Sequence, residues 1–484
     1  MFKTLKPKWR LGICIIVLLL LIVAAAPTPS FAHKTSYFPK CTTVIFGKNT
    51  TADGSVIMAH TEDLGDDDCM HLIYHPRQTH AEGEVIQFAN AIVPQVPITY
   101  AYTADEIYDA EQAFGVKAAP FTNGINEFGV TLSSNIFFSK EETLPPGQGL
   151  YYGDIGQLVM ERCKTAREAV DLIAWCVETY GFAGFSAPWP YLTFLVSDPN
   201  EGWIVEVTPR HWVAKRCPDD GAIFYANELQ IETEWDLACD DLIDYAIARG
   251  WYDPSSGEPF NFKQAYGDRL GEYWNTVRES RLRELFEPKL GSITVEDVME
   301  VYRDHLDGTE DYHVPHTAPW PIYTICAPWT HACEIYHLRS YMPPAIGCVM
   351  WIAPSSPCCS VFTPIYAGNR GDPPIEWRTG NNKFNSKSAW WVIEQIQRVV
   401  AGYENTLENW EALYPRVRAT WALMERIEFI QTAHLEKTAM KLWRLGHTKQ
   451  ALELLTKYTY NRLHINYLIA RMLLHWVQLN TLLS

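Results

Sequence analysis

Cys41 stands where a cysteine could become the first residue of a processed chain. It follows a basic and apolar leader and a short segment, 33–40, and it begins the run CTTVIFG. Cleavage between Lys40 and Cys41 would give this residue a free α-amine beside its thiol. The ordinary pKa values of the two groups are about 8 and about 8.5, so the amine can take the thiol proton near neutral pH. The residue would then be a nucleophile that carries its own base.

The first 32 residues have the pattern of a removed signal peptide. Four basic residues precede an apolar run of 16 residues, and the small residues Ser30 and Ala32 end the segment where signal peptidase reads. The apolar run is shorter than the ~20 residues that cross a bilayer. We therefore expect 1–32 to be a signal peptide, 33–40 a propeptide, and the protein to be secreted or periplasmic. The alternative is a signal-anchored structural protein whose mature chain begins near Met1.

Composition limits the partners of the chain. Its 484 residues are 47% hydrophobic, which is enough for a large core and for two domains. The net charge is −17 and no basic run follows the leader, which argues against nucleic-acid binding. No later run is apolar enough to cross a membrane, so we expect no stable span in the mature chain. A homo-oligomer stays open.

The other cysteines and histidines indicate no metal site. An exported protein can pair its cysteines, so a disulfide is open where they cluster in sequence. The spacing of that cluster lacks the two-residue separation of zinc knuckles. His313 and His316 lie in a proline-rich segment typical of a surface loop. With no glycine-rich phosphate loop either, we expect no cofactor. The cysteines of the cluster are Cys326, Cys333, Cys348, Cys358 and Cys359.

Two β-hairpins are predicted to position the chemistry. The β-prone run 42–46, an Asp-Gly turn and a return strand over 56–60 place Cys41 at the open end of the first hairpin. A second hairpin is predicted over 118–135, with its turn at Asn-Glu-Phe-Gly. Asn135, the last residue of this hairpin, would end its second strand.

Helices and further strands complete the pattern. Helices are predicted over 154–162 and 165–179, the second with a capping box, and hairpins follow over 191–226. The order of strands, helices and strands indicates an α+β layered sandwich. The last hundred residues have apolar residues at helical spacing. We expect a catalytic domain over 41–384 and a helical region over 385–484 packed on it.

An ordered series of segments resembles the dipeptidase A family of cysteine peptidases, within the N-terminal-nucleophile hydrolase superfamily. Secernins, bile-salt hydrolases and penicillin V acylases are more distant relatives, and the likeness runs from Cys41 to about residue 403. The segments are CTT at 41–43, GK at 47–48, DGS at 53–55, AHTED at 59–63, NEFGV at 126–130, DIGQ at 154–157, SDPNEGW at 197–203, HWVAKR at 211–216, RDH at 303–305, GT at 308–309 and SAWW at 388–391.

The resemblance implies an αββα sandwich of two stacked antiparallel sheets between helix layers. It implies self-activation by removal of 33–40, and attack by Cys41 on a peptide carbonyl through a thioester. The expected substrates are small peptides. A related linear-amide hydrolase acting on N-acyl amino acids shares this centre and stays open. So does a non-catalytic binding protein that retains the fold.

Three supporting residues carry over from the resemblance. Asp63 matches an acid beside the nucleophile's amine, where a carboxylate would orient the ammonium. Asn135 and Asn227 match amides that donate to a developing oxyanion, a contact worth ~3 kcal/mol. The alternatives are a solvated acid for Asp63, near the run 66–68, and strand-end turns for the two asparagines.

One position departs from the family. His60 stands where the family usually has arginine, so a hydrogen bond to the nucleophile can be kept while the fixed positive charge is lost. A second, substrate-binding arginine of the related acylases is expected near Arg281 or Arg283, and we assign it to Arg281.

Overall fold

The computed structural model describes residues 40–64, 68–111, 116–184, 191–312, 323–401 and 407–483. The predicted signal peptide, residues 33–39 of the predicted propeptide, the acids at 66 and 67, and both His313 and His316 lie outside the described residues. Within these ranges, no helix combines the length and the apolar character needed to cross a bilayer.

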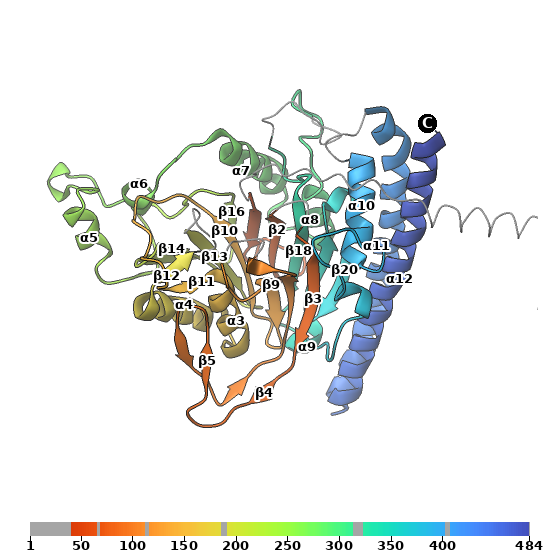
Figure 1. Ribbon diagram of the computed structural model, residues 1–484, viewed down its shortest axis with the longest axis horizontal. Coiled ribbons are helices and arrows are strands. Elements are labelled where there is room, and N and C mark those ends of the chain that lie inside the picture. Colours follow the sequence, from red (N-terminus) through yellow and green to blue (C-terminus); the bar gives the residue numbers. More distant parts are fainter. Residues whose placement is uncertain are drawn as a thin grey trace, which may run out of the picture.

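Two antiparallel sheets form the centre of the molecule (Figure 1). The six-stranded sheet has the order β16 (Ala222–Tyr225), β1 (Thr42–Phe46), β2 (Val56–Asp63), β18 (Thr330–Leu338), β19 (Cys348–Pro354), β20 (Thr363–Tyr366). The eight-stranded sheet has the order β17 (Leu237–Ala238), β15 (Trp212–Arg216), β14 (Gly202–Val207), β13 (Leu192–Ser197), β10 (Thr131–Ile136), β9 (Phe121–Asn126), β8 (Tyr102–Ile107), β3 (Met70–His75). Smaller pairs join β4 (Gln78–Thr79) to β7 (Ile98–Thr99), β5 (Val85–Gln87) to β6 (Ile92–Pro94), and β11 (Leu150–Tyr151) to β12 (Phe182–Gly184).

Helices follow the strands in several groups. The α-helices are α3 (Tyr152–Arg162), α4 (Ala166–Tyr180), α5 (Leu242–Ala248), α6 (Phe262–Tyr266), α7 (Tyr273–Phe286), α8 (Val295–Val301), α9 (Pro344–Gly347), α10 (Ala389–Ala401), α11 (Leu407–Arg444) and α12 (Thr448–Leu483). Short 3₁₀ turns are η1 (Pro254–Ser256), η2 (Glu287–Lys289), η3 (Pro357–Cys359) and η4 (Ile375–Trp377).

Side-chain alternation shows how the layers stack. On the inner face of β2, Met58 contacts Ser197 of β13 across the gap between the sheets. On its outer face, Ile57 packs in a second core with Leu282 of α7. The far face of the eight-stranded sheet packs on helices, where Phe194 lies against Tyr152 of α3 with ring centroids 5.4 Å apart. The expected α+β, four-layer αββα fold is confirmed.

The predicted first hairpin has the observed strand β1, and its return strand is longer than expected. β2 continues three residues past His60, because β18 pairs with its other edge and brings Thr330 opposite Asp63. That pairing joins residues more than 260 positions apart, so no local pattern could show it. The predicted helix start at Thr165 is present, since Thr165 Oγ1 accepts a hydrogen bond from the Glu168 amide at 3.1 Å.

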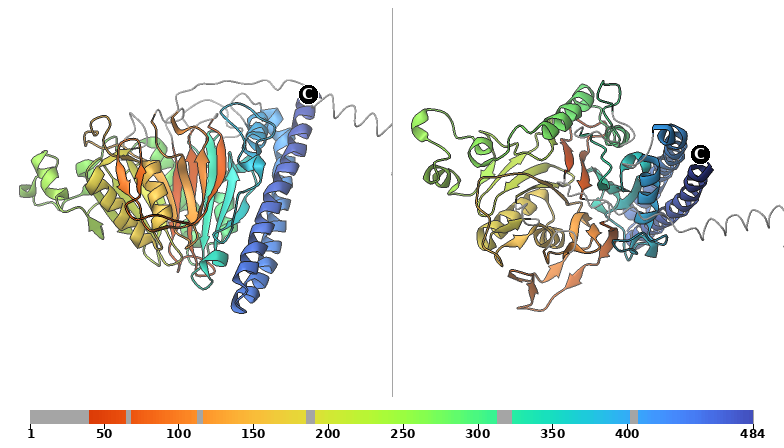
Figure 2. Two further views of the ribbon diagram at one scale, coloured as in Figure 1. Left: turned by 60° about the horizontal axis from the view of Figure 1, so that its bottom comes forward. Right: turned by 45° about the horizontal axis from the view of Figure 1, so that its top comes forward.

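The C-terminal helices pack against the six-stranded sheet. Figures 1 and 2 show α11 and α12 side by side along one side of the molecule, with α10 next to them. Trp421 of α11 donates to the Cys359 carbonyl at 2.9 Å, and Trp390 of α10 donates to the His331 carbonyl at 2.9 Å. Thr459 of α12 donates to the Pro364 carbonyl of β20 at 3.1 Å.

Gly153 lies where α3 packs closely against the segment that precedes β9. A Cβ atom at this position would lie 2.0 Å from the Ala119 carbonyl oxygen, and Asp154 holds that segment through the Ala119 amide. We expect Gly153→Ala to lower the free energy of unfolding by about 1–3 kcal/mol from overpacking, measured by urea denaturation. Gln157→Ala on the half-buried side of α3 is the control, and equal midpoints for the two variants would show that the contact relaxes.

Candidate active site

Cys41 lies at the open end of the hairpin formed by β1 and β2, and the residue is 2% exposed. Thr43 pairs with His60 across this hairpin. Because side chains alternate along a strand, the side chains of Cys41, His60 and Glu62 share the face between the two sheets. The Cys41 Sγ atom lies 3.6 Å from Glu62 Oε1. The sulfur predicted to be the nucleophile therefore contacts a buried carboxyl group.

His60 connects Thr43 to Glu62. Thr43 Oγ1 donates to Asn135 Oδ1 at 2.6 Å, so its 2.9 Å contact with His60 Nδ1 takes its proton from the ring. His60 Nε2 lies 3.3 Å from Glu62 Oε2, and Asn123 Nδ2 donates to the same oxygen at 3.2 Å. The family's arginine is thus replaced by a histidine coupled to an acid.

Asp63 lies on the opposite face of β2. Its Oδ1 accepts a hydrogen bond from Thr330 Oγ1 at 2.7 Å, and its backbone carbonyl accepts one from the Lys40 amide at 3.2 Å. Burial raises the pKa of Asp63 to about 7, against the opposing effects of the Thr330 hydrogen bond and the positive charge of Arg278. The predicted acid therefore lies beside the junction of residues 40 and 41, in a buried environment.

Arg278 of α7 holds the other side of this junction. Its Nη1 donates to the Cys41 carbonyl at 2.7 Å and to Thr42 Oγ1 at 3.0 Å. Its Nη2 donates to Asn227 Oδ1 at 2.9 Å and to Asn275 Oδ1 at 3.2 Å. The residue is only 2% exposed. A fixed positive charge is therefore built into the centre from a helix, although position 60 does not carry one.

Arg281, predicted to bind substrate, makes different contacts. Its guanidinium binds Asp304 through Nε at 2.9 Å and through Nη2 at 2.7 Å. Arg283, the other arginine considered, is about half exposed at the helix surface. The guanidinium beside Cys41 is that of Arg278, one helical turn earlier, because this part of α7 faces β1. Substrate binding by Arg281 stays a prediction, and the structure places Arg281 in a pair with Asp304 rather than beside Cys41.

Asn135 and Asn227 join the two sheets near Cys41. Asn135 Nδ2 donates to the Ala226 carbonyl at 2.7 Å, and Asn227 Nδ2 donates to the Ile136 carbonyl at 2.9 Å. Each amide nitrogen has two protons, and each of these contacts uses one. Asn135 is completely buried, whereas Asn227 retains 5% exposure and contacts Arg278. The geometry thus favours Asn227 over Asn135 as a donor to a reacting group, and both roles stay predictions.

The surroundings of residues 40 and 41 disfavour the charged forms of both side chains. Burial raises the pKa of the Cys41 thiol well above its usual range, and the acids Glu62 and Asp63 raise it further. Burial and Arg278 lower the pKa of Lys40 to about 7. The Lys40 Nζ atom lies 3.3 Å from the centre of the Tyr323 ring. In the continuous chain, the thiol is therefore held in its unreactive neutral form.

A wider group of acids lies behind Glu62, between the sheets. Glu334 of β18 pairs with His60 of β2 in the strand register, and burial raises its pKa well above the usual range, reinforced by Asp105 and Glu62. Asp105 lies 3.6 Å from His331. The interior next to the predicted nucleophile is therefore rich in titratable groups rather than apolar.

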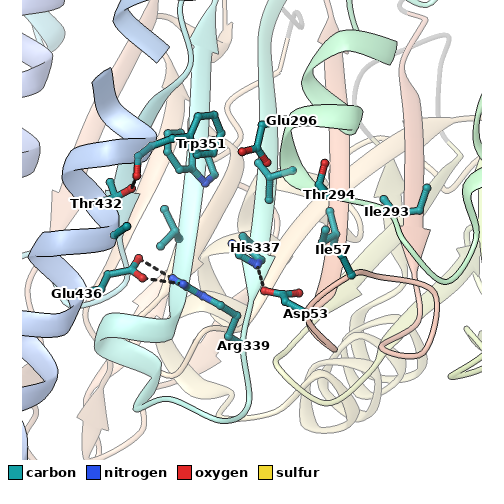
Figure 3. Close-up of a pocket in the computed structure, with 15 residues that line it drawn as sticks. Asp53, Ile57, Ile293, Thr294, Glu296, His337, Arg339, Trp351, Thr432 and Glu436 are labelled. Atoms are coloured by element: carbon teal, nitrogen blue, oxygen red, sulfur yellow. Dashed lines mark hydrogen bonds and ion pairs between the residues drawn. The ribbon is translucent and has the colours of Figure 1, made fainter. Parts of the chain in front are cut away.

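A cavity of about 260 Å³ lies on the outer face of the six-stranded sheet (Figure 3). Trp351 and Ile57 line it, and both belong to the core on the side of the sheet away from the eight-stranded sheet. Four of its polar and charged groups form two pairs: His337 with Asp53 at 2.8 Å, and Arg339 with Glu436 at 2.7 Å. This cavity is separate from the Cys41 centre, and its pairs are drawn as dashed lines in Figure 3.

Comparison with known proteins identifies the family of this chain. The model of peptidase family C69 matches residues 40–415. The chain belongs to peptidase family C69. It is 28% identical to a probable dipeptidase of Salmonella dublin over 69% of this chain and 82% of that protein. It is 24% identical to a probable dipeptidase of Latilactobacillus sakei, over 79% and 85%. Among solved structures it is similar to penicillin V acylase from Agrobacterium tumefaciens, with a TM-score of 0.37, 16% identity, and 67% and 86% coverage.

Family membership makes this C69 protein a peptidase and confirms the resemblance to the dipeptidase A family. Among the side chains that contact the predicted ones, sequence reasoning missed Glu62, Arg278 and Thr330. Alternation along β2 could have indicated Glu62, because it lies two residues from His60 on the same face. Arg278 follows Asn275 by three residues, the spacing of one helix face. No pattern in the residues around Thr330 indicates that it contacts Asp63.

The cost of burying Lys40 can be measured in the unprocessed chain carrying Cys41→Ala. The folded pKa of Lys40 is about 7 and the unfolded value is about 10.4. Between these two pH values the unfolded chain binds the Lys40 proton and the folded chain does not. The free energy of unfolding is therefore highest above about pH 10.4, falls as pH decreases, and has lost this contribution once the pH has passed through about 7. We expect Lys40→Met to raise the free energy of unfolding more at about pH 6 than at about pH 10.

Urea denaturation at the two pH values provides the measurement. Lys48→Met is the control, because Lys48 is 40% exposed in a surface pair with Asp219, where a charge is worth little. A Lys40→Met effect that is the same at both pH values would contradict the shifted pKa.

Proposed function

We propose that this C69 peptidase is an exported cysteine dipeptidase, activated when the bond between Lys40 and Cys41 is cleaved. One observation carries the proposal: the peptide groups on both sides of this bond are held at the centre. The amide of Lys40 donates to the Asp63 carbonyl, and the carbonyl of Cys41 accepts from Arg278. The named similarity to probable dipeptidases supports the substrate class. The leader supports export to a secreted or periplasmic location.

Cleavage changes the chemistry of residue 41. It removes the buried lysine and creates an α-amine beside Asp63, where the carboxylate can hold and orient the ammonium. The amine takes the thiol proton, and the Sγ atom attacks the carbonyl carbon of the substrate's peptide bond. The new ammonium also offsets the acids that raise the thiol pKa in the continuous chain.

The acyl-enzyme cycle then balances without a cofactor. The tetrahedral oxyanion collapses, the C–N bond breaks, and the leaving amine takes the proton from the Cys41 ammonium. Water next attacks the thioester while the amine takes one of its protons. Collapse releases the free acid, and the ammonium returns that proton to the departing thiolate, which restores the thiol. The second amide proton of Asn227 is the donor we assign to the oxyanion, with Arg278 holding Asn227 Oδ1.

Cys41 carries the first test. Intact mass and N-terminal sequencing of the exported wild-type protein should show a start at Cys41, and a panel of dipeptides should be hydrolysed. Cys41→Ala should retain residues 33–40 and have no activity, while Cys41→Ser should be severely slowed. Cys176→Ala, a buried cysteine on α4, is the matched control and should behave as wild type.

The outcomes separate the parts of the proposal. Full activity in Cys41→Ala would end the assignment of the nucleophile. An active wild-type protein that starts at His33 would exclude the α-amine as base. Cleavage of N-acyl amino acids in preference to dipeptides would replace the substrate class and leave the mechanism in place.

Arg278 and Arg281 provide a matched pair on one helix. A lysine cannot reproduce the forked contacts of Arg278 with Cys41 and Asn227. Because displacement of reacting groups by about 1 Å costs about 10²-fold, we expect Arg278→Lys to lower kcat/KM by about that factor. Arg281→Lys should weaken the pair with Asp304 and lower the melting temperature, with kcat/KM close to wild type. Equal losses of kcat/KM in the two variants would remove Arg278 from the centre.

A further inference from the structure

Three separate segments bring cysteines and a histidine together away from Cys41. His305 follows α8, Cys326 precedes β18, and Cys358 and Cys359 lie in η3. All four residues are buried, with His305 at 3% exposure and the cysteines at 0%. The cysteines of the described residues are all unpaired, so the disulfide considered from the sequence is not formed here.

The donor atoms of this cluster have the spacing of metal ligands. One ring nitrogen of His305 and the sulfur atoms of Cys326 and Cys358 all lie within 4.8 Å of one another. The Cys358 and Cys359 sulfur atoms are 3.9 Å apart. Two thiolates at about 2.3 Å from a tetrahedral zinc ion lie about 3.8 Å apart, and a thiolate and an imidazole nitrogen about 3.6 Å apart. The donor atoms of His305, Cys326 and Cys358 therefore already have ligand spacing. The sulfur of Cys359, which is not part of that group, would turn toward them to complete a tetrahedral set.

The surrounding contacts hold the three segments in place. The Cys326 amide donates to the Asp304 carbonyl at 3.2 Å, next to His305. Arg303 donates to the Pro357 carbonyl at 2.9 Å, which fixes η3 against the end of α8. The Trp410 ring of α11 lies edge-on to His305, with centroids 5.9 Å apart. The cluster is thus organised by the backbone and covered from solvent by α11.

We propose that His305, Cys326, Cys358 and Cys359 form a structural site for Zn²⁺. Three thiolates and one imidazole are the donors that Zn²⁺ takes in closed structural sites. Rules based on sequence spacing do not identify this set, because two of its cysteines are adjacent in η3 and its histidine lies far from them in the sequence. A disulfide would use only two of the sulfur atoms and leave the third sulfur and the imidazole beside it.

The ion would stabilise one wall of the Cys41 centre. Cys326 lies four residues before Thr330, whose hydroxyl binds Asp63 at 2.7 Å. Tyr323, three residues before Cys326, packs against Lys40. Zinc would therefore join the segment 323–330 to α8 and η3, and so fix the position of the groups that hold Asp63. Binding of the metal itself does not depend on the proposed peptidase mechanism.

The test measures zinc in the full chain carrying Cys41→Ala. This background is needed because Cys41, His60 and Glu62 also have ligand atoms within 4.8 Å of one another. The protein is purified with a reductant, exposed to ZnCl₂, dialysed, and analysed for zinc by mass spectrometry. We expect one zinc per chain, and Co²⁺ in its place should give thiolate-to-metal charge-transfer absorption with tetrahedral d–d bands.

Variants map the ligands. Cys326→Ser, Cys358→Ser and His305→Ala should each reduce bound zinc to less than about a tenth at limiting metal concentration. Cys333→Ser is the matched control, because Cys333 is equally buried on β18, and it should keep the zinc. If the ligand variants do not fold, the Co²⁺ spectrum of the parent chain decides.

Two results would overturn the proposal. The first is a reduced, folded parent chain that retains no zinc and gives no thiolate band with Co²⁺. The second is zinc that stays bound in all three ligand variants, which would place it elsewhere. A Cys326–Cys358 cross-link in the isolated chain, together with no zinc uptake after reduction, would establish a disulfide instead.

Discussion

The buried guanidinium of Arg278 is the interaction on which the Cys41 centre depends. It binds the Cys41 carbonyl, Thr42, Asn227 and Asn275, and so joins β1, the end of β16 and α7. A buried cation is tolerated only when its donors are satisfied, and these acceptors satisfy them. Sliding α7 by one turn would break the contacts of Arg278 with Cys41, Thr42 and Asn227, whereas Asn275 lies on the same helix. The helix position and the orientation of Cys41 are therefore fixed together.

Strand alternation supplies the acids around this cation. Glu62 points between the sheets toward the sulfur, and its neighbour Asp63 points to the opposite face toward Lys40. Cys41, at the strand end, is thus flanked by carboxyl groups on both sides, which raise the pKa of its thiol while the chain is continuous. Under the proposed function, the same acids become partners of a new ammonium. Cleavage of the bond between Lys40 and Cys41 would then turn surroundings that keep the thiol neutral into surroundings that stabilise the new ammonium.

Local patterns predicted the elements that depend on neighbouring residues. The strand at 42–46 and the helix start at Thr165 are examples, because a turn and a cap are short-range signals. Local patterns ended β2 too early, since its last residues are fixed by pairing with β18. The family resemblance placed the second arginine near Arg281 or Arg283, because sequence likeness locates a helix but not the face that it turns toward a strand. That choice is made by packing.

The sequence by itself predicted Cys41 as the nucleophile and indicated the family and the order of strands and helices. These follow from a motif series, a leader and periodicities that lie within short stretches of chain. Only the tertiary structure decided that Arg278 supplies the cation, that Thr330 holds Asp63, and that His305 meets Cys326 and Cys358. Those contacts join residues from separate segments of the chain. Their distances are set by the sheet order and by the docking of α7, α8 and α11, which no local pattern of residues encodes.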